Sequence, residues 1–435
     1  MKINIITLGC SKNTADSEHL AGHLKKAGFE VYFDRAQKDC DIIIVNTCGF
    51  IGDAKEESVN TLLEQVDIKQ RGRKQRKIFA VGCLVERYRE ELRAELPEID
   101  GFYGVHQWDE IVKSLKADFH EQLEKERLQS TPGHYAYLKI AEGCNRSCSY
   151  CAIPMIRGKH KSRPIEDLVA EAKEMVANGV KEIIVIAQDT TYYGLDLYGE
   201  RRLGELLDRL ATESGAEWIR LHYTYPSSFP DDAIDAIARH DNICKYIDIP
   251  LQHINSRLLS SMQRGINREA TLSLLEKFRE KIPNVAIRTT LIVGYPGETE
   301  AEFEELKTFV RDARFNRMGV FAYSPEEGTP AYKLGDPVSD EEKQRRIDEL
   351  MTIQDAIALQ YNEQKVGKTF RVIVDRREGD YFIGRTEQDS PEVDDEVLIH
   401  PHSSLHIGQF AYVTIQQAVE HDLFATVVTR PTHKK

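Results

Sequence analysis

Toward the N-terminus, apolar residues fall into short unbroken runs, and the segments between them have helical spacing. Buried strands are predicted over Ile3–Leu8, Asp41–Val45 and Ile78–Val81. Helices are predicted over Asp16–Lys26, Lys55–Val66 and Glu86–Glu95. Strands without polar alternation, each followed by a helix, are typical of a parallel sheet covered on both faces. The pattern therefore predicts an α/β domain with a flavodoxin- or Rossmann-like parallel sheet over residues 1–118.

A longer alternation of strands and helices follows a polar, charge-rich linker at residues 119–133. Helices such as Ile165–Asn178 and Arg268–Lys281 separate the strands, and the charged helix Ser339–Gln364 ends the region. Six strand–helix units predict an incomplete, TIM-like (β/α)6 barrel over residues 134–364, with its chemistry at the C-terminal ends of the strands. The predicted strands are Tyr137–Ile140, Glu182–Ile186, Trp218–His222, Tyr246–Ile249, Ala286–Val293 and Met318–Ala322.

The pattern changes again after the charged helix. Short strands with alternating apolar and polar residues are separated by turns, which is typical of a small antiparallel β-barrel. This barrel is predicted over residues 365–431. Its five strands are Phe370–Asp375, Tyr381–Thr386, Glu396–Ile399, Phe410–Gln416 and Leu423–Val428.

The chain has 435 residues, of which 41% are hydrophobic and 30% are charged, the balance of an ordinary globular protein. No apolar run is long enough to cross a membrane, and Met1–Gly9 leads directly into a strand rather than a signal peptide. We therefore expect a cytoplasmic protein without membrane contact, whose thiols stay reduced. The net charge of −13 argues against broad, non-specific binding to nucleic acid.

Three cysteines lie close together in the pattern Cys144-x3-Cys148-x2-Cys151, with Tyr150 just before the last one. Reduced thiols at this spacing indicate a metal site. Three thiolates hold three corners of a [4Fe–4S] cubane and leave the fourth iron open to a ligand that is not protein. The alternative is a partial zinc site, but zinc sites usually recruit a fourth ligand and none lies nearby in the sequence.

Three further cysteines, Cys10, Cys48 and Cys83, each follow one of the predicted N-terminal strands. Because the carboxyl ends of parallel strands meet at one edge of a sheet, we expect these thiols to converge and hold a second cluster. The alternative is that each is a small buried hydrophobe. Cys40 and Cys244 have no such placement, and we interpret both as structural.

The loop from Cys144 to Cys151, with its aromatic Tyr150, resembles that of the radical S-adenosylmethionine (SAM) superfamily. The resemblance implies that SAM binds the open iron and is cleaved to a 5′-deoxyadenosyl radical, which abstracts hydrogen from an unactivated carbon. It implies that the clusters carry the chemistry, and no catalytic side chain is predicted. The cofactor-binding residues that we expect at the loop and at the strand ends are Tyr150, Gln188, Asp189, Gln252 and Gly294.

The layout of nearly the whole chain resembles the methylthiotransferase family, which joins an N-terminal cluster domain, a radical-SAM barrel and a small β-barrel called TRAM. The resemblance implies that one SAM supplies the radical and a second supplies the methyl group. The cluster held by Cys10, Cys48 and Cys83 would then deliver sulfur. An external electron donor and a sulfur donor are implied as partners. A non-enzymatic iron–sulfur carrier or binding module is the alternative from another class.

Two segments look like the RimO-type branch of that family, which modifies the β-carbon of an aspartate in a small-subunit ribosomal protein. They are Cys151–Arg163 and Ala187–Gly194, and the second contains Gln188-Asp189-Thr190. The alternative is a tRNA adenosine methylthiotransferase, whose version of the second motif resembles Gly-Gln-Asn. Arg157 and Arg163 in the first segment are expected either to meet a carboxylate, of SAM or of the substrate aspartate, or to be solvated.

The charge of the C-terminal barrel favours a basic protein substrate over RNA. Between Val366 and Arg430 six Lys or Arg residues stand against eleven Asp or Glu, which include Glu392, Asp394, Asp395 and Glu396. An RNA-binding barrel should be basic, whereas an acidic one suits a basic ribosomal protein. A solvated acidic face without a partner is the alternative. The basic stretch Lys69–Lys77 is expected to be solvated or to contact nucleic acid only in the context of the ribosome.

Overall fold

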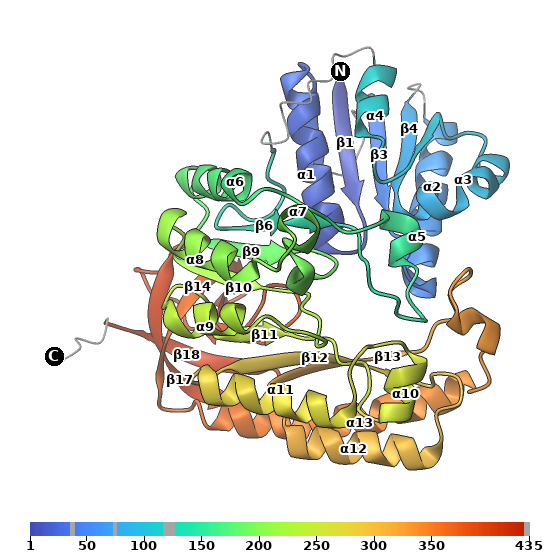
Figure 1. Cartoon of the computed structure of the whole chain (residues 1–435). Helices are drawn as coiled ribbons and strands as arrows, with labels where there is room; N and C mark the ends of the chain where they lie inside the picture. The colour runs from blue at the N-terminus through green and yellow to red at the C-terminus, as the bar shows by residue number, and fades with distance from the viewer. Residues whose placement is uncertain (35–39, 73–75, 116–126, 430–435) are drawn as a thin grey trace.

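Five parallel strands form the N-terminal sheet of the computed structural model, which describes residues 1–34, 40–72, 76–115 and 127–429 (Figure 1). Their order, β2-β1-β3-β4-β5, is the flavodoxin order, in which ligands bind where β1 and β3 diverge. The strands are β1 (Lys2–Thr7), β2 (Glu30–Phe33), β3 (Ile42–Thr47), β4 (Lys77–Gly82) and β5 (Gly101–Tyr103). The predicted parallel sheet is confirmed, with short edge strands β2 and β5 added to the three central ones.

Helices cover both faces of this sheet, as unbroken apolar strands require. Side chains of α2 (Gly52–Arg71) and α3 (Cys83–Glu95) pack with Ile43 and Val45 on one face. On the other face α1 (Ser11–Lys26) and α4 (Trp108–Ser114) pack with their strand neighbours. The β1, β3 and β4 ends are therefore left open at the carboxyl edge.

The predicted linker, residues 119–133, lies partly outside the described residues, which resume at Arg127. From there the chain is held against the fully buried Glu18 of α1. Ser130 donates from its backbone nitrogen and its hydroxyl to Glu18 Oε1 at 2.6 and 2.7 Å, and Arg127 Nε donates to Oε2 at 2.6 Å. These bonds fix the end of the linker on α1, the helix that Cys10 immediately precedes.

Six parallel strands follow one another in chain order and form the incomplete barrel that the sequence predicts. One sheet joins β6, β9 and β10, the other joins β11, β12 and β13, and a bridge between Ile219 and Ile243 links the two. No pairing joins β13 back to β6 in the described part of the chain. The strands are β6 (Tyr135–Lys139), β9 (Glu182–Ile186), β10 (Trp218–Leu221), β11 (Tyr246–Asp248), β12 (Ala286–Val293) and β13 (Arg317–Ala322).

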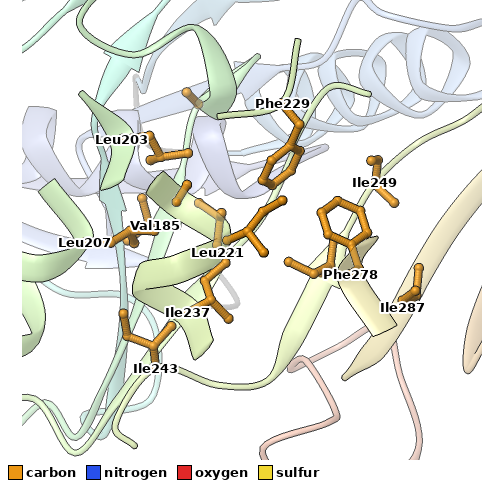
Figure 2. Close-up of a cluster of buried hydrophobic side chains, with 14 of the residues drawn as sticks. Val185, Leu203, Leu207, Leu221, Phe229, Ile237, Ile243, Ile249, Phe278 and Ile287 are labelled. Carbon is orange, nitrogen blue, oxygen red and sulfur yellow. The ribbon is translucent and has the colours of Figure 1, made fainter. Parts of the chain in front are cut away.

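The core of this region lies between the strands and the surrounding helices. Figure 2 shows Val185 and Leu221 from the strands with Leu207, Ile237 and Phe278 from the helices. The covering helices are α6 (Ile165–Ala177), α8 (Leu203–Glu213), α9 (Asp231–Arg239), α11 (Arg268–Lys281), α12 (Glu300–Ala313) and α13 (Asp340–Glu363). Shorter elements near the strand ends are β7 (Ala141–Glu142), α5 (Ile153–Arg157), β8 (Lys161–Ser162), α7 (Leu195–Tyr198) and α10 (Ser256–Ser261).

The C-terminal strands close into a five-stranded barrel in the order β14-β15-β16-β18-β17. Four of its pairings are antiparallel, as predicted, and β16 pairs with β18 in parallel. An odd number of strands cannot alternate in direction around a closed ring, so at least one parallel pair is required. The strands are β14 (Thr369–Glu378), β15 (Tyr381–Arg385), β16 (Glu396–Ile399), β17 (Phe410–Ala418) and β18 (Asp422–Val428).

The loop between β15 and β16 enters the larger barrel at the end where its strands begin. Arg317, the first residue of β13, binds Asp389 at 2.5 Å and Asp395 at 3.0 Å. Tyr246, the first residue of β11, donates to Asp394 Oδ2 at 2.6 Å. The three carboxylates are almost fully buried there. The expectation that they belong to an acidic docking surface is wrong, because they are buried inside the chain against Arg317 and Arg288.

This buried loop is expected to stabilise the junction of the two barrels. Burial acts to raise the pKa of Asp389, but the charges of Arg317 and Lys365 together with hydrogen bonds from Thr386 and Arg317 outweigh it, so this pKa is lowered. Asp389→Ala leaves Arg317 buried without this partner, which is costly. We expect the midpoint of thermal unfolding to fall by on the order of 5 °C.

Glu420→Ala, which removes an exposed acid from the same small barrel, is the matched control and should leave that midpoint nearly unchanged. Differential scanning calorimetry measures both variants. Equal midpoints for the two would contradict the role given to the buried loop.

Candidate active site

Three thiols lie where neighbouring parallel strands end, and we call them the N-terminal triad: Cys10, Cys48 and Cys83. Asn13 in the first turn of α1 connects these ends. Its amide donates to the carbonyl oxygens of Leu8 at 2.8 Å and Thr47 at 3.1 Å. A Cβ at Gly9, where φ is +85°, would lie 2.9 Å from the Cys48 sulfur. The sheet thus brings together thiols that are far apart in the sequence.

The charge environment differs among these thiols. Burial raises the pKa of Cys48 and raises that of Cys83 to about 11. Burial also acts to raise the pKa of Cys10, but Lys12, Arg157 and two backbone N–H groups at the start of α1 outweigh it, so this pKa is lowered. Cys10 is therefore the thiol of this triad that most readily becomes a thiolate.

A second group, the loop triad, follows the first barrel strand: Cys144, Cys148 and Cys151. The Cys148 sulfur lies 3.3 Å from Arg264 Nη1 and 3.4 Å from the Tyr225 hydroxyl. The backbone nitrogen of Arg146 donates to the Cys144 sulfur at 3.4 Å. Burial raises the pKa of Cys144 to about 11 and that of Cys151 to about 12. Cationic and N–H donors toward sulfur suit bound, deprotonated thiolates.

The two triads lie on either side of a shared wall. Cys83 packs with Ala152 and Ile156, which come just after the last cysteine of the loop triad. Arg157 reaches across, with Nη2 3.2 Å from the Cys83 sulfur. The short helix α5 carries these loop-side residues and lies against α3 (Figure 1). The N-terminal sheet and the barrel loop therefore present their cysteines to the same region.

Arg157 meets carboxylates, as the sequence leads us to expect, but they belong to the protein itself. Its Nη1 lies 2.6 Å from Asp16 Oδ2 and 3.2 Å from Glu142 Oε2. Arg163 binds Glu171 at 2.7 Å and the Lys139 carbonyl at 3.0 Å. Both guanidinium groups hold the fold together at this edge of the barrel.

The expected cofactor-binding residues lie at the C-terminal ends of β9, β11 and β12 and beside the loop triad. Gln188 donates to Glu142 Oε1 at 2.6 Å, and its own Oε1 is buried without a partner among the described residues. Gln252 Oε1 is likewise unpartnered there, and the Gln252 backbone has φ +76°, which is strained for a side-chain-bearing residue. Two unsatisfied buried acceptors at the barrel mouth fit a bound ligand that donates hydrogen bonds.

The other three residues expected to bind the cofactor lie against other residues of the chain. Asp189 is buried and accepts from Arg146 Nε at 2.6 Å and from the Thr191 backbone at 2.9 Å. Tyr150 is half-buried, with its hydroxyl 3.3 Å from Arg264. Gly294 has φ +72°, and a Cβ there would come 2.5 Å from Lys343. Asp189 and Tyr150 lie beside the loop triad, whereas Gly294 lies against Lys343 of α13.

Several polar residues at the site were missed by reasoning from the sequence: Lys12, Glu142, Arg146, Tyr225 and Arg264. Only proximity to a cysteine in the chain could have signalled Lys12 and Arg146, and nothing local signals the others. In the basic stretch, Arg73 and Lys74 lie outside the described residues, and Lys69 binds Asp100 at 2.6 Å.

Each triad offers three thiols, the number of protein ligands that a cubane with one open iron needs. Within the described ranges no three His, Cys, Asp or Glu side chains converge as ligands of one metal ion would. In a cubane each thiolate binds a different iron, so the sulfurs stand wider apart than ligands of one ion. None of the eight cysteines is in a disulfide.

The helices of the described part also offer no segment long and apolar enough to traverse a bilayer.

Comparison with known families divides the chain into three matches. The uncharacterized protein family UPF0004 matches residues 2–104, the radical SAM superfamily matches residues 138–310, and the TRAM domain matches residues 366–428.

Curated relatives match over almost the full length. The chain is 52% identical over 434 residues to the ribosomal protein uS12 methylthiotransferase RimO of Christiangramia forsetii, which covers 100% of this chain and 96% of that protein. It is 54% identical over 427 residues to the enzyme of the same name from Flavobacterium johnsoniae, covering 97% of each. The chain belongs to this family. It is a SAM-dependent radical transferase, and the tRNA-modifying alternative is not favoured.

Solved structures share the fold at low sequence identity. The radical SAM methyltransferase TsrM of Kitasatospora setae, solved with cobalamin and a [4Fe–4S] cluster, gives a TM-score of 0.55 at 14% identity and covers 94% of this chain and 83% of its own. The cobalamin-dependent radical enzyme OxsB gives 0.51 at 11%, covering 81% and 56%. The expected joining of an α/β sheet domain to a radical-SAM barrel is thus a known arrangement.

The contrast between Cys10 and Cys144 gives a prediction for chelator-treated, metal-free protein. Both side chains are half-buried, but the pKa of Cys10 is lowered and that of Cys144 is raised. Iodoacetamide at about pH 7.5 should therefore alkylate Cys10 first, because the thiolate is the nucleophile. The difference between the alkylation rates of Cys10 and Cys144 should narrow as the pH rises, because a larger fraction of Cys144 is then deprotonated. Peptide mass spectrometry measures both rates, with unfolded protein as the control; equal rates in folded protein would contradict the assigned environments.

Proposed function

We propose that this chain transfers a methylthio group to the β-carbon of an aspartate in ribosomal protein uS12. The loop triad holds the cluster at which SAM is cleaved, and the N-terminal triad holds the cluster that delivers sulfur. The observation that carries the proposal is the shared wall: Cys83 packs against Ala152 and Ile156, directly after the loop triad. Because α3 and α5 are in contact there, the two clusters would be held on neighbouring elements.

SAM and two [4Fe–4S] clusters are the cofactors, and when bound they supply the radical, the methyl group and the sulfur. The chain's own residues bind and position them. Arg264 Nη1 lies 3.3 Å from the Cys148 sulfur and stabilises it as a thiolate, and the Tyr225 hydroxyl donates to the Arg264 carbonyl at 2.8 Å and holds that arginine in place. The unpartnered Oε1 atoms of Gln188 and Gln252 would accept hydrogen bonds from the ammonium group of SAM.

Arg146 and Gly294 help to position the residues that line the proposed SAM site. Arg146 is fixed by Asp189 and stacks over Tyr225, with its guanidinium carbon 4.0 Å from the ring centroid. Gly294, in the left-handed region, leaves room for the Lys343 side chain of α13, which a Cβ would approach to 2.5 Å, and so helps to position the turn after β12 at the barrel mouth.

The protein substrate is a basic ribosomal protein, and an external electron donor and a sulfur donor complete the set of partners. Docking does not use Asp389, Asp394 and Asp395, which are buried. Contact with nucleic acid belongs to the context of the ribosome. A cytoplasmic location, where thiols stay reduced and ribosomes are found, is part of the same proposal.

Metal analysis tests the two-cluster assignment. Anaerobic reconstitution should give about eight irons per chain, because each cubane contains four. Replacing all three cysteines of either triad by alanine should leave about four. Cys40→Ala with Cys244→Ala is the matched control and should retain the full content, since neither belongs to a triad. One zinc per chain would rule out radical chemistry.

Mass spectrometry tests the substrate. Given SAM, reductant and a sulfide source, the reconstituted enzyme should add one methylthio group to uS12 and none to tRNA, and should release 5′-deoxyadenosine. The loop-triad alanine variant should neither modify uS12 nor release 5′-deoxyadenosine. Product on tRNA alone would refute the ribosomal assignment, and absence of 5′-deoxyadenosine would indicate a carrier or binding module instead.

A further inference from the structure

Lys12 is a buried cation without a carboxylate partner. Its side chain belongs to a residue that is only 8% exposed, yet in the described part of the chain no carboxylate or carbonyl oxygen binds its ammonium. The neighbouring cations are all engaged: Lys139 and Arg157 bind Asp16 and Glu142, and Arg146 binds Asp189. An ammonium taken out of water without a counter-ion is costly.

The Tyr223 ring supports this ammonium, which lies 2.9 Å from the ring centroid. The ring offsets part of the desolvation cost through its negative face but supplies no hydrogen-bond acceptor at the ammonium. Tyr223 itself is held under strain, with φ +57°. Its hydroxyl lies 3.1 Å from the Ser11 hydroxyl, and its backbone nitrogen donates to Asp248 at 2.9 Å. Strain that the surroundings enforce is typical of functional positions.

The position of Lys12 relates it to both triads. It stands two residues after Cys10, in the first turn of α1. Tyr223 lies two residues beyond the end of β10, at the C-terminal mouth of the barrel where the loop triad also lies. An anion bound to Lys12 would therefore lie between the sulfur-delivering site and the barrel mouth.

We propose that Lys12 binds the side-chain carboxylate of the substrate aspartate and thereby positions its β-carbon. This inference rests on the proposed function. In aspartate the carboxylate is bonded directly to the β-carbon, so an ammonium beside Cys10 holds the reacting carbon next to the site from which sulfur comes. A neutral asparagine leaves the ammonium unpaired, and Lys12 therefore selects aspartate over asparagine. Lys12 acts as a substrate-positioning residue and takes no part in bond making.

A double-mutant cycle on binding tests the proposal without relying on turnover. Fluorescently labelled uS12 is titrated with anaerobically reconstituted holoenzyme, and anisotropy gives the Kd. The uS12 carries either the aspartate that the wild-type enzyme modifies or asparagine in its place. Lys12→Gln should weaken binding of the aspartate form about tenfold, because a charge-assisted hydrogen bond is lost. It should change binding of the asparagine form by less than about twofold.

Matched variants distinguish the effect of losing the Lys12 charge from the effect of disturbing the fold. Lys12→Arg should keep most of the preference for aspartate. Lys113→Gln, which removes an exposed lysine from α4, should leave all affinities unchanged. Iron content and the thermal midpoint verify each variant. If Lys12→Gln loses iron, Lys12→Met, whose apolar side chain suits the face of Tyr223, supplies the same comparison.

Each result that would contradict the proposal leads to a different conclusion. Equal weakening of the aspartate and asparagine forms would show a structural role and overturn the proposal, as would no weakening of either. Loss of SAM affinity in equilibrium dialysis, with uS12 binding intact, would assign Lys12 to the cofactor carboxylate instead. If the wild-type enzyme neither binds nor modifies uS12, the proposed function itself fails. A wild-type enzyme that modifies uS12, but without the Lys12-dependent preference, overturns only this inference.

Discussion

Three buried charged side chains and one half-buried one, between α1 and the edge of the barrel, determine how the two halves of the site face each other. Asp16 comes from α1, and its partners Lys139 and Arg157 come from β6 and α5, with Glu142 of β7 completing the set. Two cations and two carboxylates neutralise one another, and each group is costly to bury alone. Any other placement of α1 on β6 would leave charges unpaired, so the network specifies the register of the two domains.

The chemistry depends on that register. Because Arg157 is anchored on Asp16, its second nitrogen is held 3.2 Å from the Cys83 sulfur and 2.6 Å from Asn13 Oδ1. Asn13 in turn ties the ends of the strands that carry the N-terminal triad. A slip of one helical residue would separate these contacts. The same arginine thus supports the sheet edge and supplies positive charge beside a thiol, which favours the deprotonated form that binds iron.

Much of this arrangement was accessible from the sequence, because parallel strands have one carboxyl edge. Unbroken apolar runs before Cys10, Cys48 and Cys83 were enough to predict that these side chains share that edge. The partners of Arg157 were not accessible, since Asp16 lies on another domain and no local pattern encodes the contact. Charge counting also misled: Asp389 and Asp394 add to the acidity of the small barrel but lie buried against Arg317 and Arg288. The edge strand β5, three residues long, is too short for a periodic signal.

The most direct measurement is an anaerobic crystal structure of the reconstituted enzyme, with iron located by anomalous scattering. The account predicts two separate four-iron centres, one bonded to the N-terminal triad and one to the loop triad, each with a single iron that no side chain binds. A fourth protein ligand on the loop-triad centre, or a single centre shared by cysteines of both groups, would contradict it.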